Sequence, residues 1–291
     1  MPWDPPAAPP TAPPSSADSL RATAWAAGQQ PLLSIVPTCA ELALHQAQAS
    51  LVAAVRAGER RLRVDLLPPG LNAALEGSHG VSEPLLGFAA LALADALKGV
   101  SVQAVFASAG TAASAQRSYE RFGGRLASCE LGALAGAVTR DEVRAGVDFT
   151  PSIDAASPRD VYVFVAPRNA RGDAVALAIE AAVARVPTAC FVLLNPDLED
   201  TVLGSTFGIG TSASVRSFCA TFTRCYHYKG AFQIARPANR PLEKGCVLRH
   251  YGGPYVAHAL KTGGPGGGGG FERLQTFEEL PSREQLGALR W

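Results

Sequence analysis

The fold is decided by one stretch, Asp160–Asp197, which reads DVYVFVAPRNARGDAVALAIEAAVARVPTACFVLLNPD. Val161–Val165 and Ala189–Leu194 are short runs that are apolar at every position. Between them, Gly172–Arg185 carries apolar side chains three and four residues apart, which is the spacing of a helix with one apolar face. A fully apolar strand must be covered on both faces, as in a parallel sheet between two layers of helices. The stretch therefore predicts a β-strand, an α-helix and a second strand parallel to the first.

Strands and helices also alternate on the N-terminal side of this unit. Thr38 and Glu41 have the spacing of a capping box, which predicts a helix that starts there and ends at Gly58. The further elements predicted here are strands at Arg61–Leu67, Val100–Ala107 and Arg125–Leu131 and helices at Leu85–Lys98, Ser108–Phe122 and Leu134–Ala145. Arg61–Leu67 alternates charged with apolar residues, so one of its faces is polar, and we expect this strand to lie near an edge of the sheet.

The last third of the chain is typical of strands in close succession. The strand-like runs are Tyr226–Ile234, Cys246–Tyr251, Tyr255–Leu260 and Phe271–Phe277. Short breaks between them predict an antiparallel extension of the sheet. The tract Gly263–Gly270 fits a flexible linker or the tip of a long hairpin, and the strands on both sides favour the hairpin. Ser282 and Gln285 again have capping-box spacing and predict a short final helix.

These patterns predict an α/β fold, an open, mostly parallel, Rossmann-like sheet sandwiched by helices, with an antiparallel β extension near the C-terminus. Residues 31–291 are expected to form a single domain. Residues 1–30 are rich in proline, alanine and serine without apolar periodicity, so we expect them to be disordered. They lack the charged start and apolar core of a secretory signal, and acidic residues such as Asp4 and Asp18 are atypical of an organelle transit peptide. Whether the segment is a transit peptide stays open.

Composition excludes several classes of protein. A formal net charge of +1 gives no basic excess for nucleic acid. The longest strongly apolar run, Leu85–Ala94, is about half of the ~20 residues that a membrane span needs, although peripheral membrane contact stays open. The six cysteines contain no CxxC pair and are expected to be reduced thiols. A redox role for the close pair Cys219 and Cys225 stays open.

No metal or cofactor site is expected. Three histidines, His227, His250 and His258, fall on the C-terminal strands, where three imidazoles in register would be able to hold a metal ion. Ordinary packing between strands is the expected role of these side chains. No serine or cysteine nucleophile stands in a recognisable catalytic motif, so no catalytic residue is predicted.

Ligands of open parallel sheets bind beyond the carboxyl ends of the strands. Reading off those ends gives one candidate ligand-binding rim. Its residues are Ser108, Gly110, Thr111, Arg168, Asn169, Asn195 and Asp197. Asp65 and Asp197 are the carboxylates that we consider for acid–base or metal chemistry.

Each part of the rim also has a structural interpretation. Ser108 and Thr111 stand at a helix start, where free N–H groups favour an anion, but the segment lacks a phosphate-loop motif and an ordinary helix cap is favoured. Arg168 fits either a ligand's anion or a solvated loop charge. Asn195 precedes a proline, and a role in holding the strand end with an Asx-type turn is favoured over substrate contact.

Several segments in order resemble the DUF1995 family. They are PTCAELALHQAQASLVAAVRAGERRLRVDL, the strand DVYVFVAP, the strand end LLNPDL, and the tail RCYHYKGAF, GCVLRHYGGPYVAHAL and FEELPSREQL. The resemblance covers residues 37–289 and rests on the order of these segments. The chain departs from the family where an R-x-Y-P-x-x-W-like segment is expected, because Gly252 follows Tyr251 and Tyr255 stands roughly where the tryptophan would be.

The family consists of plastid and cyanobacterial proteins, includes a plant assembly factor for photosystem II, and also occurs fused to a plastid adenylate kinase. The resemblance implies a soluble protein of the chloroplast stroma that binds a protein partner, such as a thylakoid assembly intermediate, and it implies no catalytic mechanism. Arg249, Tyr251 and Tyr255 are the candidate partner-binding residues, because aromatic side chains and arginine anchor interfaces. The alternative is an enzyme or sensor for a phosphorylated or nucleotide-like small molecule at the rim.

Overall fold

The computed structural model describes residues 35–68, 71, 82–122, 124, 129–133, 153, 157–168, 174–198, 213–235, 240–261 and 270–289. The chain divides into two units, Met1–Ile35 and Val36–Trp291, and all elements named below belong to the second. The predicted disorder of residues 1–30, the predicted helix Leu134–Ala145 and the candidate Asn169 lie outside the described residues.

Within the described residues, nine strands form one sheet in the order β3-β2-β4-β5-β1-β6-β7-β8-β9. The strands are β1 (Arg61–Leu67), β2 (Val102–Phe106), β3 (Cys129–Ala133), β4 (Val161–Val165), β5 (Cys190–Leu194), β6 (Thr223–Ala235), β7 (Arg240–His250), β8 (Tyr255–Lys261) and β9 (Gly270–Phe277). All pairs from β3 to β6 are parallel, and the pairs from β6 to β9 are antiparallel. The predicted α/β fold with its antiparallel extension is confirmed.

The unit from β4 to β5 has the predicted geometry. The two strands are parallel neighbours, with Val161 opposite Cys190 and Val165 opposite Leu194. Every residue of both strands is buried. The helix between them, α7 (Ala174–Arg185), packs its apolar side chains onto one face of the sheet. The rings of Tyr162 and Phe191 stack there with their centroids 5.3 Å apart.

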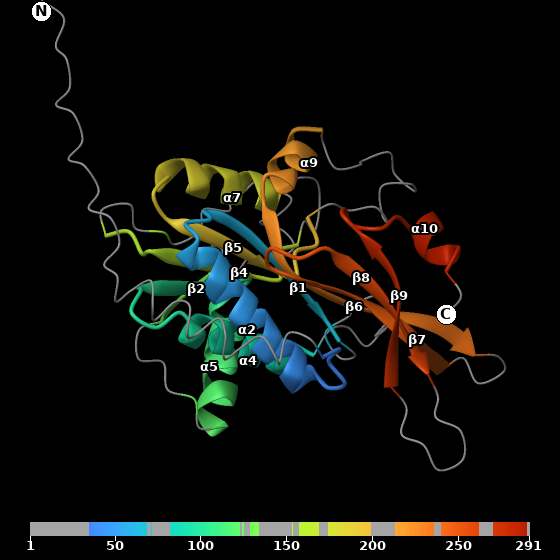
Figure 1. Ribbon diagram of the computed structural model, residues 1–291. Coiled ribbons are helices and arrows are strands. Elements are labelled where there is room, and N and C mark those ends of the chain that lie inside the picture. Colours follow the sequence, from blue (N-terminus) through green and yellow to red (C-terminus); the bar gives the residue numbers. More distant parts are fainter. Residues whose placement is uncertain are drawn as a thin grey trace, which may run out of the picture. The chain divides into compact units, whose positions relative to one another are not determined.

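Helices cover the parallel part of the sheet on both faces (Figure 1). One layer contains α2 (Ala40–Arg56), α4 (Glu83–Ala96) and α5 (Ala109–Arg121), and the other contains α7 and α9 (Ala213–Ala220). The short helix α10 (Arg283–Gly287) follows β9 and begins at the predicted Ser282–Gln285 capping box. β8 and β9 pair up to Lys261 and Gly270, so the glycine tract joins two strands of a hairpin, as predicted.

Two expectations about the N-terminal elements are wrong. Helix α2 begins after Cys39, and no side chain caps it, so the Thr38–Glu41 capping box does not form. β1 does not lie near an edge, because it pairs with β5 on one side and β6 on the other. Side chains on its polar face belong to a largely buried polar cluster, described below, and do not form a solvent-exposed surface.

Gly87 marks a close approach of α4 to α5. A Cβ atom added at Gly87 would lie 2.5 Å from the Cβ of Ala115 and 3.0 Å from its Cα. The positions of these two atoms are fixed by the backbone of α5, so a rotamer change cannot move them away. The two helices therefore pack at a distance that only glycine allows at this position.

We predict that Gly87→Ala lowers the free energy of unfolding by about 1–3 kcal/mol, because the added methyl group overpacks the contact between the helices. The control is Gly287→Ala in α10, where no atom lies within 4 Å of the added Cβ, and a change within about 0.5 kcal/mol is expected. Urea denaturation followed by circular dichroism measures both. Equal stability of Gly87→Ala and the wild type would contradict the close approach.

Candidate functional site

The carboxyl ends of β4 and β5 have the same backbone course. Ala166 and Asn195 follow the two strands with φ angles of 43° and 46°, in the left-handed region, and each precedes a proline. Two residues further on, Arg168 and Asp197 form a parallel bridge, and Arg168 Nε lies 2.6 Å from Asp197 Oδ2. The structure thus brings these two candidates together. Their side chains are 65% and 51% exposed, so the pair contributes little stability.

Asn195 ties the end of β5 to β1. Its Oδ1 accepts from the backbone N–H of Leu66 at 2.6 Å, and its Nδ2 donates to the Leu66 carbonyl at 2.7 Å. The side-chain amide therefore acts as one more peptide group between the two strands. The favoured structural role of Asn195 fits this geometry, although the partner is a neighbouring strand and not a local turn.

This amide lies at a topological switch point of the sheet. From β1 the chain continues to α4 in one helix layer, and from the adjacent β5 it continues to α9 in the other (Figure 1). Crevices of open α/β sheets lie where neighbouring strands send their chains to opposite sides. At this switch point, the Asn195 amide is already bonded to both polar groups of the Leu66 backbone.

The Ser108 segment forms a helix cap. Ser108 Oγ accepts from the Thr111 N–H at 3.2 Å, and the Ser108 N–H donates to Thr111 Oγ1 at 3.1 Å. Both hydroxyl groups are thus used in a capping box at the start of α5. A Cβ at Gly110 would lie 3.7 Å from Ser108 Oγ, an ordinary contact.

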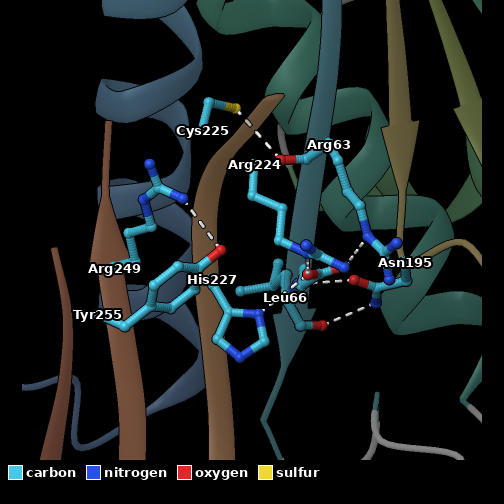
Figure 2. A network of polar contacts seen from close by, with 9 residues as sticks. Arg63, Leu66, Asn195, Arg224, Cys225, His227, Arg249 and Tyr255 are labelled. Carbon is cyan, nitrogen blue, oxygen red and sulfur yellow. Dashed lines mark hydrogen bonds and ion pairs between the residues drawn. The ribbon is translucent and has the colours of Figure 1, made fainter. Parts of the chain in front are cut away.

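The structure also shows a largely buried polar cluster that the sequence did not predict as one site (Figure 2). Its residues, called the arginine cluster from here on, are Arg63, Asp65, Arg224, His227, Arg249 and Tyr255. Asp65 is 3% exposed, and its carboxylate has three partners. Arg63 Nε lies 2.7 Å from Oδ1, and Arg224 Nε and His227 Nδ1 lie 3.1 Å and 2.9 Å from Oδ2.

A β-bulge in β6 makes this arrangement possible. Arg224 and His227 are three residues apart, so in a regular strand they would point to opposite faces. Opposite β1, however, the register shifts between Arg63 and Val64, so that Arg224 faces Arg63, Tyr226 faces Val64 and His227 faces Asp65. The bulge therefore places both basic side chains beside one carboxylate.

The extra residue of the bulge, Cys225, is fully buried, and its thiol donates to the Arg63 carbonyl at 3.5 Å. Burial raises the pKa of Cys225 well above its usual value, and it raises that of Cys190 to about 12 and that of Cys129 to about 11. Thiols with such pKa values are poor nucleophiles at neutral pH. All six cysteines are free thiols.

The charges of the cluster shift the pKa values of its members. Burial raises the pKa of Asp65, but the charge of Arg63 and the hydrogen bond from His227 outweigh burial and hold it well below its usual range. Burial lowers the pKa of His227 despite the neighbouring Asp65 carboxylate. At neutral pH the cluster therefore contains an ionised Asp65 and a neutral His227, which donates from Nδ1.

The candidate partner-binding residues lie at the β7–β8 turn. Arg249 Nη1 donates to the Tyr255 hydroxyl and Nε donates to the Gly253 carbonyl, both at 3.0 Å. Tyr255 is 2% exposed and contacts the His227 ring edge to face, with the centroids 5.6 Å apart. Tyr251 is half-buried, and its hydroxyl donates to Glu59 at 3.3 Å. The structure thus places Arg249 and Tyr255 inside the arginine cluster and leaves Tyr251 at the surface.

The part of the chain that the structure describes contains no group of three histidine, cysteine or acidic side chains that would be able to hold a metal ion. None of the helices in that part is long and apolar enough to cross a bilayer.

We predict that Asn195→Gly lowers the free energy of unfolding by about 1–3 kcal/mol, because the two backbone groups of Leu66 lose their partners. Asn195→Ala should cost about 1 kcal/mol more, since alanine is strained in the left-handed region. Ala166→Gly is the matched control, because it relieves the same backbone strain without removing a side-chain bond, and it should not destabilise. Denaturant titration measures the three variants. An Asn195→Gly variant as stable as the wild type would contradict the bridging role.

We predict that the free energy of unfolding falls as the pH drops below about 6.5, by up to about 1.4 kcal/mol per pH unit for His227. The folded state holds this histidine neutral, so in that range the unfolded chain binds more protons. His227→Gln should make the dependence shallower. Leu177→Gln, at an exposed position on α7, should leave it unchanged. Urea titrations between pH 7.5 and pH 5 test this, and equal slopes in all three proteins would contradict it.

No curated protein matches this chain. A family match, in contrast, covers residues 37–288 and therefore includes every element from α2 to α10. The family is described as a domain of unknown function, and the match confirms the resemblance seen in the sequence. The chain belongs to the DUF1995 family.

Proposed function

We propose that this protein is a chloroplast auxiliary factor that binds a protein partner during the assembly or stabilisation of photosystem II at the thylakoid. The family supports this proposal, because it includes a plant photosystem II assembly factor. The observation that carries it is that polar side chains of the candidate rim are bonded to other residues of the protein. Ser108 is bonded to Thr111, Arg168 to Asp197, and Asn195 to Leu66, so these rim side chains already have partners within the protein.

A rigid sheet with its strand ends tied to one another suits a binding platform. Tyr251 is the candidate contact residue, because its ring is half-exposed at the turn after β7 while Tyr255 is buried. An aromatic side chain whose hydroxyl is already held by Glu59 loses little entropy when a partner packs against it. The protein would act in the stroma and contact the thylakoid membrane from its surface.

Affinity capture from detergent-solubilised thylakoids tests the proposal. The tagged wild type should recover photosystem II assembly intermediates, and Tyr251→Ala should reduce the recovery severalfold, as expected for an interface anchor. Phe122→Ala is the matched control, because Phe122 is a 74% exposed aromatic residue after α5, which packs on the β2–β3 end of the sheet. Absence of assembly intermediates from the wild-type eluate would reject the proposed function. Equal recovery by Tyr251→Ala would reject only the contact residue.

A second candidate function is the sensing or conversion of a phosphorylated small molecule. The observation that favours it is the arginine cluster, which contains three guanidinium groups and one carboxylate beside the switch point of the sheet. Guanidinium groups are the common protein ligands of phosphate and carboxylate. The two functions are compatible, because an assembly factor can respond to a small molecule.

A further inference from the structure

The backbone of the β7–β8 turn, residues 251–254, has a defined conformation. The Gly253 N–H donates to the His250 carbonyl at 3.0 Å, and Gly252 has a φ angle of 75°. These two features are typical of a type II β-turn, whose third residue needs a positive φ angle and is usually glycine. Tyr251 is the second residue of this turn, so its side chain is carried at the tip of the hairpin.

Arg249 holds the same turn from within the protein. Its Nε donates to the Gly253 carbonyl and its Nη1 donates to the Tyr255 hydroxyl, both at 3.0 Å (Figure 2). Its guanidinium carbon lies 4.7 Å from the centroid of the Tyr255 ring, which is itself buried. Both polar groups of the Gly253 backbone are therefore bonded, the N–H to His250 and the carbonyl to Arg249.

A third contact ties the tip of the turn to a segment far away in the sequence. The Tyr251 hydroxyl donates to Glu59 Oε1 at 3.3 Å, and Glu59 lies between α2 and β1. The backbone N–H of Glu59 donates to the Ala54 carbonyl in the last turns of α2, so the position of Glu59 is fixed as well. The Tyr251 side chain is thus held at both ends, by the turn at its Cα and by Glu59 at its hydroxyl group.

Although it is held in this way, the turn lies at the surface. Gly252 and Pro254 are exposed, and Tyr251 and Gly253 are half-buried. A Cβ atom added at Gly252 would have nothing within 4 Å, and one added at Gly253 would lie 3.5 Å from the His250 carbonyl oxygen, an ordinary contact. The tip is therefore a small convex surface of one aromatic ring, two glycines and a proline.

We infer that the β7–β8 turn is the surface by which this protein contacts its protein partner, and that Arg249 is the positioning residue that fixes the turn for this contact. The inference rests on the proposed function, for which it names the contact surface and the kind of partner. A convex tip that carries a single aromatic ring between residues without long side chains fits a concave, apolar pocket on a partner protein.

The rigidity of the turn supports a role in binding. Many β-turns lack even the hydrogen bond across the turn, so the further bonds from Arg249 and to Glu59 exceed what a hairpin needs in order to form. A loop that is ordered before binding avoids the entropy cost of becoming ordered on the partner. Tyrosine and glycine are also enriched in the binding loops of antibodies, where tyrosine provides a large contact area with few rotatable bonds.

Two substitutions at glycines of like backbone conformation test the contact surface. Gly252→Asn adds a side chain to the tip and keeps the turn, because asparagine tolerates a positive φ angle. Gly99→Asn is the matched control, since Gly99 has a φ angle of 85°, has nothing within 4 Å of an added Cβ, and lies between α4 and β2. A thermal melt checks that both variants are folded.

Binding is measured by biolayer interferometry, with the tagged protein immobilised. The probe is the photosystem II assembly intermediates that the wild type recovers from detergent-solubilised thylakoids. Gly252→Asn should raise the Kd at least about tenfold, because its side chain occupies the space that the partner fills. Gly99→Asn should bind like the wild type.

Arg249→Gln and Arg249→Lys test the positioning role. Arg249→Gln should raise the Kd about three- to tenfold, because the Gly253 carbonyl loses its charged donor, and Arg249→Lys should recover part of the affinity. If Arg249 acts through the turn that carries Tyr251, Arg249→Gln should have no further effect in the Tyr251→Ala background. Additive effects of the two substitutions would overturn the positioning role.

The outcomes separate the inference from the proposed function. If the wild type recovers no photosystem II intermediate, both are wrong. If the wild type binds and Gly252→Asn binds equally tightly, the contact surface lies elsewhere, and the inference alone is overturned. Protein-free vesicles of thylakoid lipids are a second probe. Vesicle binding by the wild type that Gly252→Asn abolishes would show that the turn contacts lipid, and would overturn the protein partner.

Discussion

The burial of one carboxylate in the middle of the sheet determines how the parallel and antiparallel parts of the sheet are joined. Asp65 is 3% exposed in a strand flanked by strands on both sides. An ionised carboxylate that is removed from water is tolerated only with close cationic or hydrogen-bonding partners. The chain supplies Arg63 from β1 itself and Arg224 and His227 from β6. The cost of desolvation is thus balanced by groups from the two strands that meet at this point, which ties β6 to one register.

That register joins the two halves of the sheet. On one side of β1 the strands are parallel and covered by helices, and beyond β6 they are antiparallel. The joint is held from the other side by Asn195, whose amide bonds to the Leu66 backbone. A one-residue slip of β6 would move His227 to the opposite face, where Tyr226 meets Gln46 of α2. The polar contacts around β1 therefore specify how the extension is attached, while apolar packing such as that of β4, β5 and α7 covers the parallel part of the sheet.

Local patterns in the sequence were sufficient for the fold class but not for the site. The apolar runs of β4 and β5, the helix between them and the C-terminal hairpins follow from spacing alone, because each is determined by neighbours in the chain. Position within the sheet does not follow from spacing. The alternation in β1 indicated a solvated edge, because a polar face usually meets water, whereas here it meets Arg224 and His227 from a strand about 160 residues later.

The rim candidates also show which contacts a sequence reveals and which it does not. Strand ends are visible in a sequence, so Arg168 and Asp197 were placed correctly at neighbouring ends and do meet. The partner of Asn195 was not visible, since Leu66 lies 129 residues earlier in the chain. The signal that would have revealed the arginine cluster was weak. Arg224 and His227 are three residues apart, a spacing that places them on one face only if a bulge intervenes, and no glycine marks that bulge.

Three of the six segments by which this chain resembles its family meet at the arginine cluster. Arg63 and Asp65 end the first segment, Arg224 and His227 belong to RCYHYKGAF, and Arg249 and Tyr255 belong to GCVLRHYGGPYVAHAL. Segments this far apart in the sequence contribute to one polar contact network, in which Asp65 bonds to His227 and Tyr255 to Arg249. Asp65 thus joins β1 to β6, Arg249 joins β7 to β8, and the contact between the Tyr255 and His227 rings links the two pairs. The residues that carry the family resemblance are therefore also the ones that attach the antiparallel extension to the parallel part of the sheet.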